Sequence, residues 1–268
     1  MIKLTESESK YSNLEELNTA ELLNYINDED NTVPQLVKKV IPQIEMLVNE
    51  AVKKLKNNGR LIYIGAGTSG RLGILDASEC PPTFGVSSDV VVGLIAGGDT
   101  AIKHAVENAE DNKSTAWESL KKINVSDADF VIGISASGST PYVLAGLQAM
   151  AAMGITTGCI VCNAGTHIAQ TVDFPIEVVT GPEFITGSTR MKAGTAQKLI
   201  LNMISTSAMI QLGKVKGNKM IDMKISNDKL IKRGVLFIMD ELGCTEYQAL
   251  TNLQKYGSVR AVLEHYND

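Results

Sequence analysis

LIYIGAGTSG, residues 61–70, decides the fold class of this 268-residue chain. A short apolar run ends in glycine and leads into a glycine-rich turn, which is typical of a buried parallel strand followed by a helix. Such runs recur at 90–95, 130–134, 157–162 and 174–179, with helical patterns at 70–79, 100–121, 141–153, 166–171 and 193–212. This alternation predicts an α/β fold, a doubly wound parallel sheet of about five strands in a three-layer αβα sandwich.

Helical segments flank the predicted sheet. Residues 1–17 are polar and expected to be loosely held, and helices are predicted over 19–27 and from Val33 to Gly59. Three short helical patterns, over 227–242, 245–256 and 258–266, predict a small C-terminal bundle. We expect an N-terminal helical segment, a sheet domain and a helical appendage, over residues 1–58, 59–213 and 214–268.

The composition argues against several classes of function. The formal net charge is −5 at pH 7, whereas a nucleic-acid surface needs a basic stripe. No apolar run reaches about 18 residues, so no membrane span is predicted and the cytoplasm is the expected location. Cys159 and Cys162 have redox-motif spacing but lie in an apolar run, so buried, reduced cysteines are expected. No cluster of His, Cys and Asp has metal-ligand spacing, and no metal site is predicted.

Two loops rich in glycine and hydroxyl groups follow predicted strands. GAGTSGRLG, residues 65–73, follows the first strand, and SASGSTP, residues 135–141, follows the third. Each precedes a helix, whose free N–H groups and dipole attract an anion. The first loop formally matches a dinucleotide fingerprint, but no acidic residue closes the second strand to bind a ribose. A phosphomonoester site is therefore favoured over a nucleotide site or a purely structural glycine turn.

A third polar segment, GPEFITGSTRMKAGTAQK at residues 181–198, precedes the apolar stretch 199–212. Its glycines allow the backbone to approach a ligand, and its hydroxyls bind phosphate or sugar oxygens without bulk. Packing alone does not explain such a segment before a buried helix. Together with the two loops it predicts a phosphosugar site.

Glu79 is one candidate catalytic acid. Pro81 is expected to end the preceding helix near Glu79, because the residue before a proline avoids helical geometry. A carboxylate there faces the negative end of the helix dipole, which favours its protonated form and suits a proton donor. An ordinary solvated glutamate at a helix end is the alternative.

Glu110 is the second candidate acid. On a helix over 100–121 it would lie at the boundary of the buried face, whereas Glu107 and Asp111 would lie far from that face. A plain surface helix is the alternative. The buried stripe is expected to consist of Ile102, Ala105, Val106 and Ala109.

The motifs together resemble the sugar isomerase (SIS) fold and, within it, the N-acetylmuramic acid 6-phosphate etherase family. The resemblance extends from about residue 10 to the C-terminus. Glucokinase regulatory proteins share parts of the motifs but are longer, with two SIS domains, and the C-terminal appendage here looks shorter than in many etherases. The segments that carry the resemblance are 27–30 (NDED), 65–82, 94–98 and 187–198.

The resemblance implies a lyase that converts N-acetylmuramic acid 6-phosphate and water into N-acetylglucosamine 6-phosphate and D-lactate, as in peptidoglycan recycling. The implied route is elimination from the open-chain aldehyde followed by hydration, with no metal or organic cofactor. Glu79 is the implied proton donor and Glu110 the second acid/base residue. A cytoplasmic homodimer is expected, with no nucleic-acid or membrane partner. The implied substrate-binding residues are Thr68, Ser69, Ser135, Ser137, Ser139, Thr140, Ser188, Thr189, Arg190 and Lys192.

Three questions stay open in the sequence. A phosphosugar isomerase and a non-catalytic phosphosugar sensor are the alternative functions. Either Arg190 or Lys192 would neutralise the phosphate or the lactyl carboxylate. Arg71 is a third cation, which would otherwise form an ion pair with Asp76.

Overall fold

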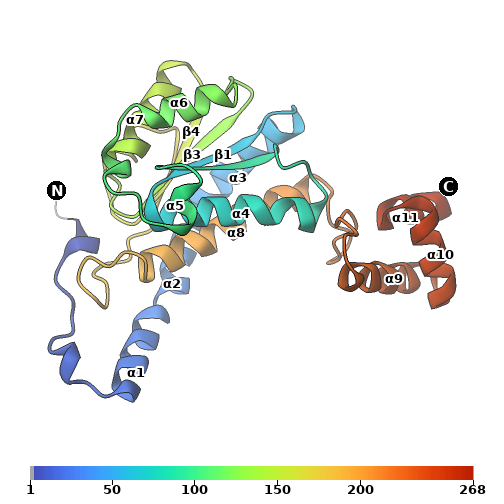
Figure 1. Ribbon diagram of the computed structural model, residues 1–268, viewed down its shortest axis with the longest axis horizontal. Coiled ribbons are helices and arrows are strands. Elements are labelled where there is room, and N and C mark those ends of the chain that lie inside the picture. Colours follow the sequence, from blue (N-terminus) through green and yellow to red (C-terminus); the bar gives the residue numbers. More distant parts are fainter. Residues whose placement is uncertain (1–2, 268) are drawn as a thin grey trace.

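Five parallel strands form one sheet in the computed structural model, which describes residues 3–267. Their order across the sheet is β2-β1-β3-β4-β5. Figure 1 shows the central strands β1, β3 and β4. Each strand overlaps one of the predicted apolar runs, so the predicted fold class is confirmed. The strands are β1 (Leu61–Gly65), β2 (Val91–Ile95), β3 (Phe130–Ser135), β4 (Thr156–Val161) and β5 (Phe174–Glu177).

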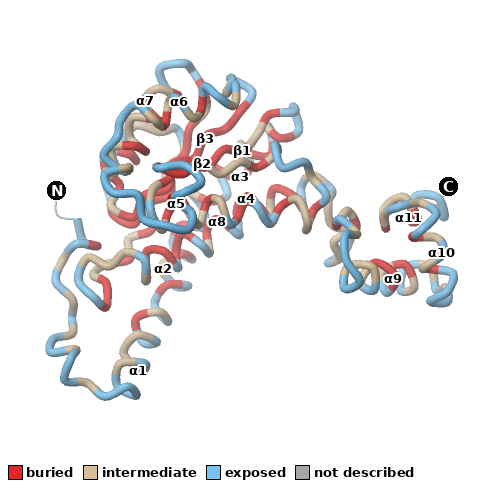
Figure 2. Tube along the Cα trace, viewed as in Figure 1, coloured by how far each residue is buried: buried red, intermediate tan, exposed pale blue. Residues whose placement is uncertain are grey.

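Helices cover both faces of the sheet. Leu61 and Tyr63 of β1 pack in a core cluster with α3 (Ile41–Lys56), α4 (Gly67–Phe84) and α8 (Lys192–Gln211). Their neighbours Ile62 and Ile64 belong to a second cluster with α6 (Thr115–Lys122) and α7 (Pro141–Ala152). Because successive side chains of a strand point to opposite faces, this alternation makes the three-layer sandwich. Figure 2 shows the buried strands between the helical layers.

The N-terminal region differs from the prediction in two ways. The long helix predicted after Val33 is two helices, α2 (Val33–Lys39) and α3, because Pro42 lacks the N–H that a continuous helix would need. The segment before α1 (Thr19–Asp30) is not loosely held, since Thr5 is fully buried and its backbone N–H donates to Asn163 Oδ1 at 3.2 Å. The N-terminal residues therefore contribute to the edge of the sheet where the site lies.

Helix α4 extends beyond its predicted end. It contains Pro81 and Pro82 and ends at Gly85, which has a positive φ of 65°. The prolines forfeit two helical hydrogen bonds close to the C-terminus, while Cys80 and Phe84 of the same turn pack in the core. The prediction that the helix ends near Glu79 is wrong, and Glu79 lies more than a turn before the helix end.

The segment predicted as one helix over 100–121 is broken. It consists of α5 (Thr100–Lys103), a 3₁₀ turn at Ala109–Asp111 and α6. Asn108 adopts the left-handed conformation, with φ 56°, which interrupts the helical path. Ile102 and Val106 of the expected buried stripe are 37% and 39% exposed, so the helical-face argument for Glu110 is wrong. The helix proposed over 166–171 is a series of turns.

The C-terminal bundle has the three predicted helices, α9 (Asp228–Leu242), α10 (Glu246–Tyr256) and α11 (Val259–Asn267). They enclose a small apolar cluster of their own, which includes Val235, Leu253 and Val262. No helix within residues 3–267 is long and apolar enough to cross a membrane. The limits of 58 and 213 for the three parts of the chain stay predictions.

Candidate functional site

A crevice is expected where the direction of strand order reverses. β1 and β3 are neighbours in the sheet, and Gly65 at the end of β1 lies opposite Ile134 of β3. From β1 the chain passes to β2 on one side, and later to β3 on the other, so the loops after β1 and β3 diverge above this point. In open parallel sheets ligands bind there, beyond the carboxyl ends of the strands. The two predicted phosphate loops are therefore adjacent.

The loop after β1 is held by close backbone packing. A Cβ atom at Gly70 would lie 2.8 Å from the Gly65 carbonyl oxygen, and Gly67 has a positive φ of 52°. These glycines allow α4 to begin directly after the strand, with the free N–H groups of its first turn at the crevice. Ser69 in that turn is buried and donates to Gln197 Oε1 of α8 at 2.9 Å.

The loop after β3 is a cluster of hydroxyl groups at the N-terminus of α7. Ser135 Oγ lies 2.8 Å from Thr140 Oγ1 and 3.4 Å from Ser137 Oγ. Ser137 Oγ lies 3.2 Å from Ser139 Oγ, and Ser135 Oγ also accepts the N–H of Gly138 at 3.2 Å. Hydroxyls that satisfy one another can turn to donate to an incoming phosphate. The structure thus brings the four predicted residues of this loop together.

The segment after β5 reaches back to the first loop. A Cβ atom at Gly194 would lie 3.4 Å from Thr68 Cγ2, so the start of α8 packs against the start of α4. Thr68, Arg190 and Lys198 line one hollow of about 300 Å³ between them. Ser188 and Thr189 are half-buried just before this point, and the Thr189 carbonyl accepts the N–H of Gly194.

Lys192 is occupied in a buried ion pair. Its side chain is 3% exposed and its ammonium donates to the Glu29 carboxylate, which also accepts from Lys10 at 3.1 Å. Burial acts to raise the pKa of Glu29, but the hydrogen bonds from Lys192 and Lys10 hold that pKa below its usual value. The sequence analysis interprets Lys192 as a substrate-binding residue. In the structure its charge is instead used in the buried ion pair with Glu29. Arg190 is exposed and has no ion pair among the described residues.

The N-terminus of α8 is capped by the chain itself. Glu183 is buried, and its carboxylate accepts the backbone N–H groups of Lys192 and Ala193 at 2.8 and 2.9 Å. Burial raises the pKa of Glu183, and these two bonds offset part of that rise. Because this helix N-terminus already holds a carboxylate, the phosphate site is better assigned to α4 and α7.

Glu110 lies beside the start of α4. It is exposed and lines a hollow of about 200 Å³ together with Gly67 and Arg71. Arg71 Nε donates to the Ile102 carbonyl at 3.0 Å, which ties the segment after β2 to α4. The predicted ion pair of Arg71 with Asp76 is not formed. Glu110 is therefore close to the crevice, although the helix from which it was argued does not exist.

Glu79 lies in a different hollow. It is exposed and lines a space of about 270 Å³ between α4 and α8, together with Asp76 and Lys198. At about 1.5 Å per residue, the stretch of α4 from Gly67 to Glu79 spans about 18 Å. The hollow of Glu110 is closed by the segment after β2, whereas that of Glu79 is closed by α8. The two acids of one chain therefore line different hollows.

Asp76 is a buried carboxyl group that the sequence reasoning missed. Tyr63 OH donates to its Oδ2 at 3.0 Å, and Ser205 Oγ donates to its Oδ1 at 2.9 Å. Burial raises the pKa of Asp76 to about 6, and the two hydrogen bonds offset part of the rise. The available signal was its helical spacing from Gly73 and Ala77, which places Asp76 on the buried face of α4.

None of the cysteines in the described chain forms a disulfide bond. Cys159 and Cys162 point to opposite faces of the sheet, one into each core cluster. Burial raises the pKa of Cys159 to about 12, which keeps it a thiol. Within residues 3–267 no three His, Cys, Asp or Glu side chains are grouped to hold a metal ion.

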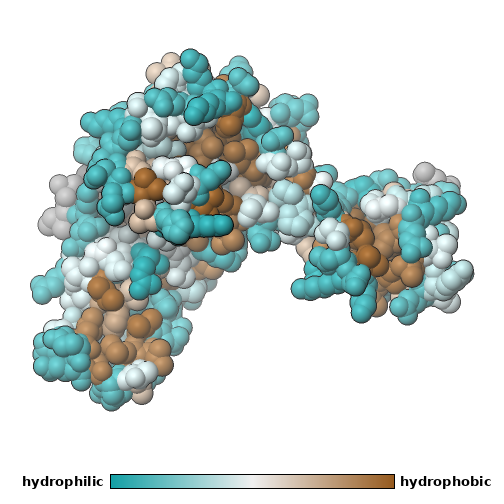
Figure 3. Space-filling view, viewed as in Figure 1, coloured by the Kyte–Doolittle hydropathy of each residue, from teal (hydrophilic) through white to brown (hydrophobic). Residues whose placement is uncertain are grey.

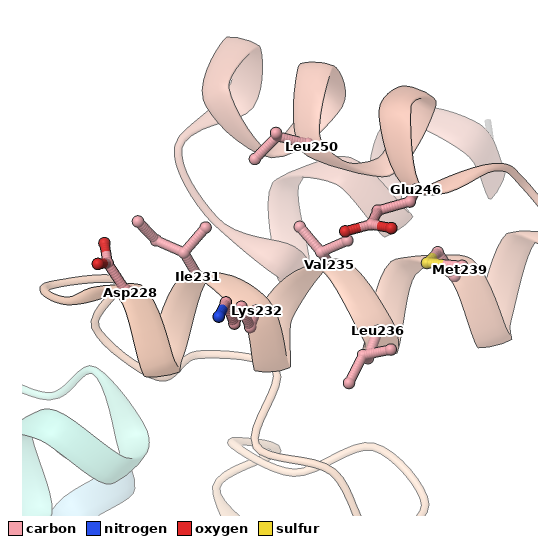
Figure 4. Close-up of a pocket in the computed structure, with 8 residues that line it drawn as sticks. All are labelled: Asp228, Ile231, Lys232, Val235, Leu236, Met239, Glu246 and Leu250. Atoms are coloured by element: carbon pink, nitrogen blue, oxygen red, sulfur yellow. The ribbon is translucent and has the colours of Figure 1, made fainter.

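A further hollow, of about 420 Å³, lies in the C-terminal bundle (Figure 4). Apolar side chains such as Ile231, Val235 and Leu250 line it, together with the charged Asp228, Lys232 and Glu246. No serine or threonine lines it, so it lacks the hydroxyls that a phosphosugar site requires.

Comparison with known proteins agrees with this fold. Residues 42–151 match the model of the glucokinase regulatory protein N-terminal SIS domain. The phosphoheptose isomerase from Neisseria gonorrhoeae superposes with a TM-score of 0.55 at 16% identity, covering 71% of this chain and 98% of that one. A phosphoheptose isomerase from Francisella tularensis gives a TM-score of 0.54 at 15% identity, covering 72% and 100%. The fold defines an SIS-domain protein.

Closer relatives narrow the class. The N-acetylmuramic acid 6-phosphate etherase of Christiangramia forsetii is 59% identical over 98% of this chain and 97% of its own length. Those of Bacteroides fragilis and Porphyromonas gingivalis are 53% and 54% identical, over 99% and 98% of this chain and 94% and 96% of their own lengths. The chain belongs to the N-acetylmuramic acid 6-phosphate etherase family.

Proposed function

We propose that the chain is a carbon–oxygen lyase that cleaves the D-lactyl ether of N-acetylmuramic acid 6-phosphate, yielding N-acetylglucosamine 6-phosphate and D-lactate. One observation carries the proposal: two hydroxyl-rich helix N-termini face one crevice in a chain whose full-length relatives are etherases. The expected location is the cytoplasm, where a phosphorylated amino sugar would be met.

The 6-phosphate binds between α4 and α7. The hydroxyls of Ser135, Ser137 and Thr140 turn to donate from the second loop, and that of Thr68 donates from the first. Ser69 joins them when its hydroxyl turns from Gln197 Oε1 to the phosphate. The free N–H groups of both helix N-termini add partial positive charge. Ser139 supports the second loop through its contact with Ser137.

The chemistry needs a base and an acid on neighbouring carbons. In the open-chain aldehyde the carbonyl acidifies the C2 proton, which Glu110 removes as a carboxylate. Glu79 protonates the ether oxygen as lactate leaves C3, and water then adds across the double bond, placing hydroxyl on C3 and a proton on C2. Each residue supplies the usual share of general acid–base catalysis, about 10²–10⁴-fold.

Arg190 is the cation of the closing segment. It is exposed beside Thr68, whereas the charge of Lys192 is engaged by Glu29. A guanidinium binds a carboxylate through two parallel hydrogen bonds, which suits the lactyl group. Ser188 and Thr189 precede it and offer hydroxyls to the sugar.

A homodimer with shared sites resolves the separation of the two acids. A general acid or base must come within roughly 3 Å of the proton that it transfers, and about 18 Å of α4 separates Glu79 from the start of the helix. We therefore assign each site Glu110 from one chain and Glu79 of the partner subunit. Leu75, one turn from Glu79, is 47% exposed. Figure 3 shows apolar surface in the region where Figure 1 places α4 and over the N-terminal helix α1. Exposed apolar surface of this kind suits an interface.

The test is D-lactate release from N-acetylmuramic acid 6-phosphate in H₂¹⁸O. Wild type is expected to release lactate and to incorporate ¹⁸O at C3, and Glu79→Gln and Glu110→Gln should each lose about 10²–10⁴-fold in kcat. Asp111→Asn, which changes the exposed acid next to Glu110, is the matched control and should retain activity. Binding without lactate release would instead favour a phosphosugar sensor, and an aldose–ketose product would favour an isomerase.

A further inference from the structure

Lys3 reaches the serine loop from the far end of the chain. Its Nζ donates to Ser139 Oγ at 2.7 Å, across 136 residues of sequence. We propose that Lys3 is a phosphate-binding residue of the crevice, carried there by residues 3–11, which we call the N-terminal strap. The proposal rests on the phosphosugar site described above and adds to it a residue that no motif contains.

The strap is anchored two residues after Lys3. Thr5 is fully buried, its N–H donates to Asn163 Oδ1 at 3.2 Å, and Asn163 Nδ2 donates to its hydroxyl at 2.9 Å. Asn163 also donates to the Ala136 carbonyl at 3.1 Å, inside the serine loop. These bonds hold the chain beside the serine loop two residues after Lys3, within reach of the contact that Lys3 makes with Ser139.

The rest of the strap binds the third polar segment. The N–H of Ser9 donates to Thr186 Oγ1 at 2.9 Å, and its hydroxyl donates to the Phe184 carbonyl at 2.7 Å. Tyr11 and Lys10 follow, and both donate to Glu29, the partner of Lys192. The strap thus joins the serine loop to the segment that closes the site.

The electrostatics of this placement point to an anion. Ser139 lies just before Thr140, the cap of α7, so the ammonium of Lys3 faces the positive end of a 12-residue helix. A cation at that end is unfavourable by itself and becomes favourable when an anion binds between the two. The hydroxyls of Ser137 and Ser139 line the same hollow of about 120 Å³ as Lys3.

The other lysine and arginine candidates are engaged or lie elsewhere, and His167 is a second basic side chain in the hollow of Lys3. Lys192 is paired with Glu29, and Arg71 donates to the Ile102 carbonyl. Arg190 lines the hollow beside Thr68 and does not line the one at the serine loop. Lys3 is the lysine that the described chain brings to that loop, and a phosphate dianion held by hydroxyls gains most from such a charge.

The experiment measures the affinity for inorganic phosphate by calorimetry, together with KM and kcat for N-acetylmuramic acid 6-phosphate. Lys3→Gln is expected to weaken phosphate binding about tenfold and to raise KM similarly with little change in kcat, since a charge-assisted bond at an exposed site lies at the low end of its range. Lys3→Arg should keep most of the affinity. Thr5→Val, which keeps the side-chain shape but removes the anchoring hydroxyl, should also weaken binding. Lys56→Gln, at the opposite end of α3 from the crevice, removes the same charge and should change nothing.

Two results would overturn the proposal: phosphate affinity of Lys3→Gln within twofold of wild type, or an equal loss in Lys56→Gln. The proposed function fails separately. If wild type binds phosphate through Lys3 but releases no lactate, the inference about Lys3 stands and the etherase activity does not.

Discussion

Mixed dimers test whether each site is shared between two chains. Glu79→Gln and Glu110→Gln each remove one acid, so every site of either homodimer lacks one group and both should be inactive. In a mixed dimer one site carries both substitutions, whereas the other combines intact Glu110 from one chain with intact Glu79 of the partner subunit. Two inactive proteins are therefore expected to restore activity when their subunits exchange.

The expected activity follows from the geometry. About 18 Å of α4 lies between Gly67, in the hollow of Glu110, and Glu79, and the two acids of one chain line separate hollows. Each site is therefore expected to take one acid from each chain. If subunits exchange at random from equal amounts, about half of the dimers are mixed and each has one intact site of two. Lactate release should then reach about one quarter of the wild-type rate, and about half for purified mixed dimers.

The assay uses two chains with different affinity tags, expressed together and purified on both tags in succession. D-lactate release is measured for the mixed dimer, for each parent and for a dimer of two differently tagged wild-type chains. Mixed dimers that are no more active than either parent would refute the shared site, as would a wild-type enzyme that is active as a monomer. Partial recovery near one half would support it.

Three further expectations concern single side chains. Ser135→Ala should raise KM about tenfold or more with a smaller effect on kcat, because it removes the hydroxyl at the centre of the serine loop; an unchanged KM would argue against its phosphate contact. The pKa of Asp76 is 3.8 in the unfolded chain and about 6 in the folded one, so the folded state gains stability from this group below about pH 4. That contribution, roughly 3 kcal/mol, is lost as the pH rises through 6. Asp76→Asn should abolish this fall in the free energy of unfolding, measured in urea from about pH 4 to 7. Glu29→Gln leaves the Lys192 ammonium buried without its carboxylate and should lower the free energy of unfolding by about 3–5 kcal/mol. The double variant Glu29→Gln with Lys192→Met should recover most of that loss. Equal free energies of unfolding for the single and double variants would contradict this.

The sheet could be predicted because its signal is local. All five residues of β1 are buried, and a strand covered on both faces reads as a continuous apolar run whatever its neighbours are. The phosphate loops could be predicted for the same reason, since glycine and hydroxyl residues directly follow the strands that position them.

Helix limits were less predictable because packing overrides local rules. A proline usually ends a helix, yet α4 continues through Pro81 and Pro82, where Phe84 gains burial in the core. In the opposite sense, apolar spacing over 100–121 imitates a helix, but the chain turns at Asn108 and leaves Ile102 exposed. The helical argument for Glu110 was thus incorrect, although the family resemblance implies the same residue. Its position beside Gly67 depends on the fold of that turn.

Long-range pairing explains the remaining differences. The residue types that bind an anion are also those of a buried ion pair, so the sequence cannot tell that Lys192 faces Glu29, 163 residues away, rather than a substrate. A polar segment without periodicity likewise reads as loosely held until Thr5 meets Asn163, 158 residues away. Glu79 is the extreme case of the same problem, because its proposed partner belongs to another chain. The sequence can nominate such a residue by type, and a single chain can show that it stands apart. The mixed dimers, which combine two chains with different substitutions, test which site it serves.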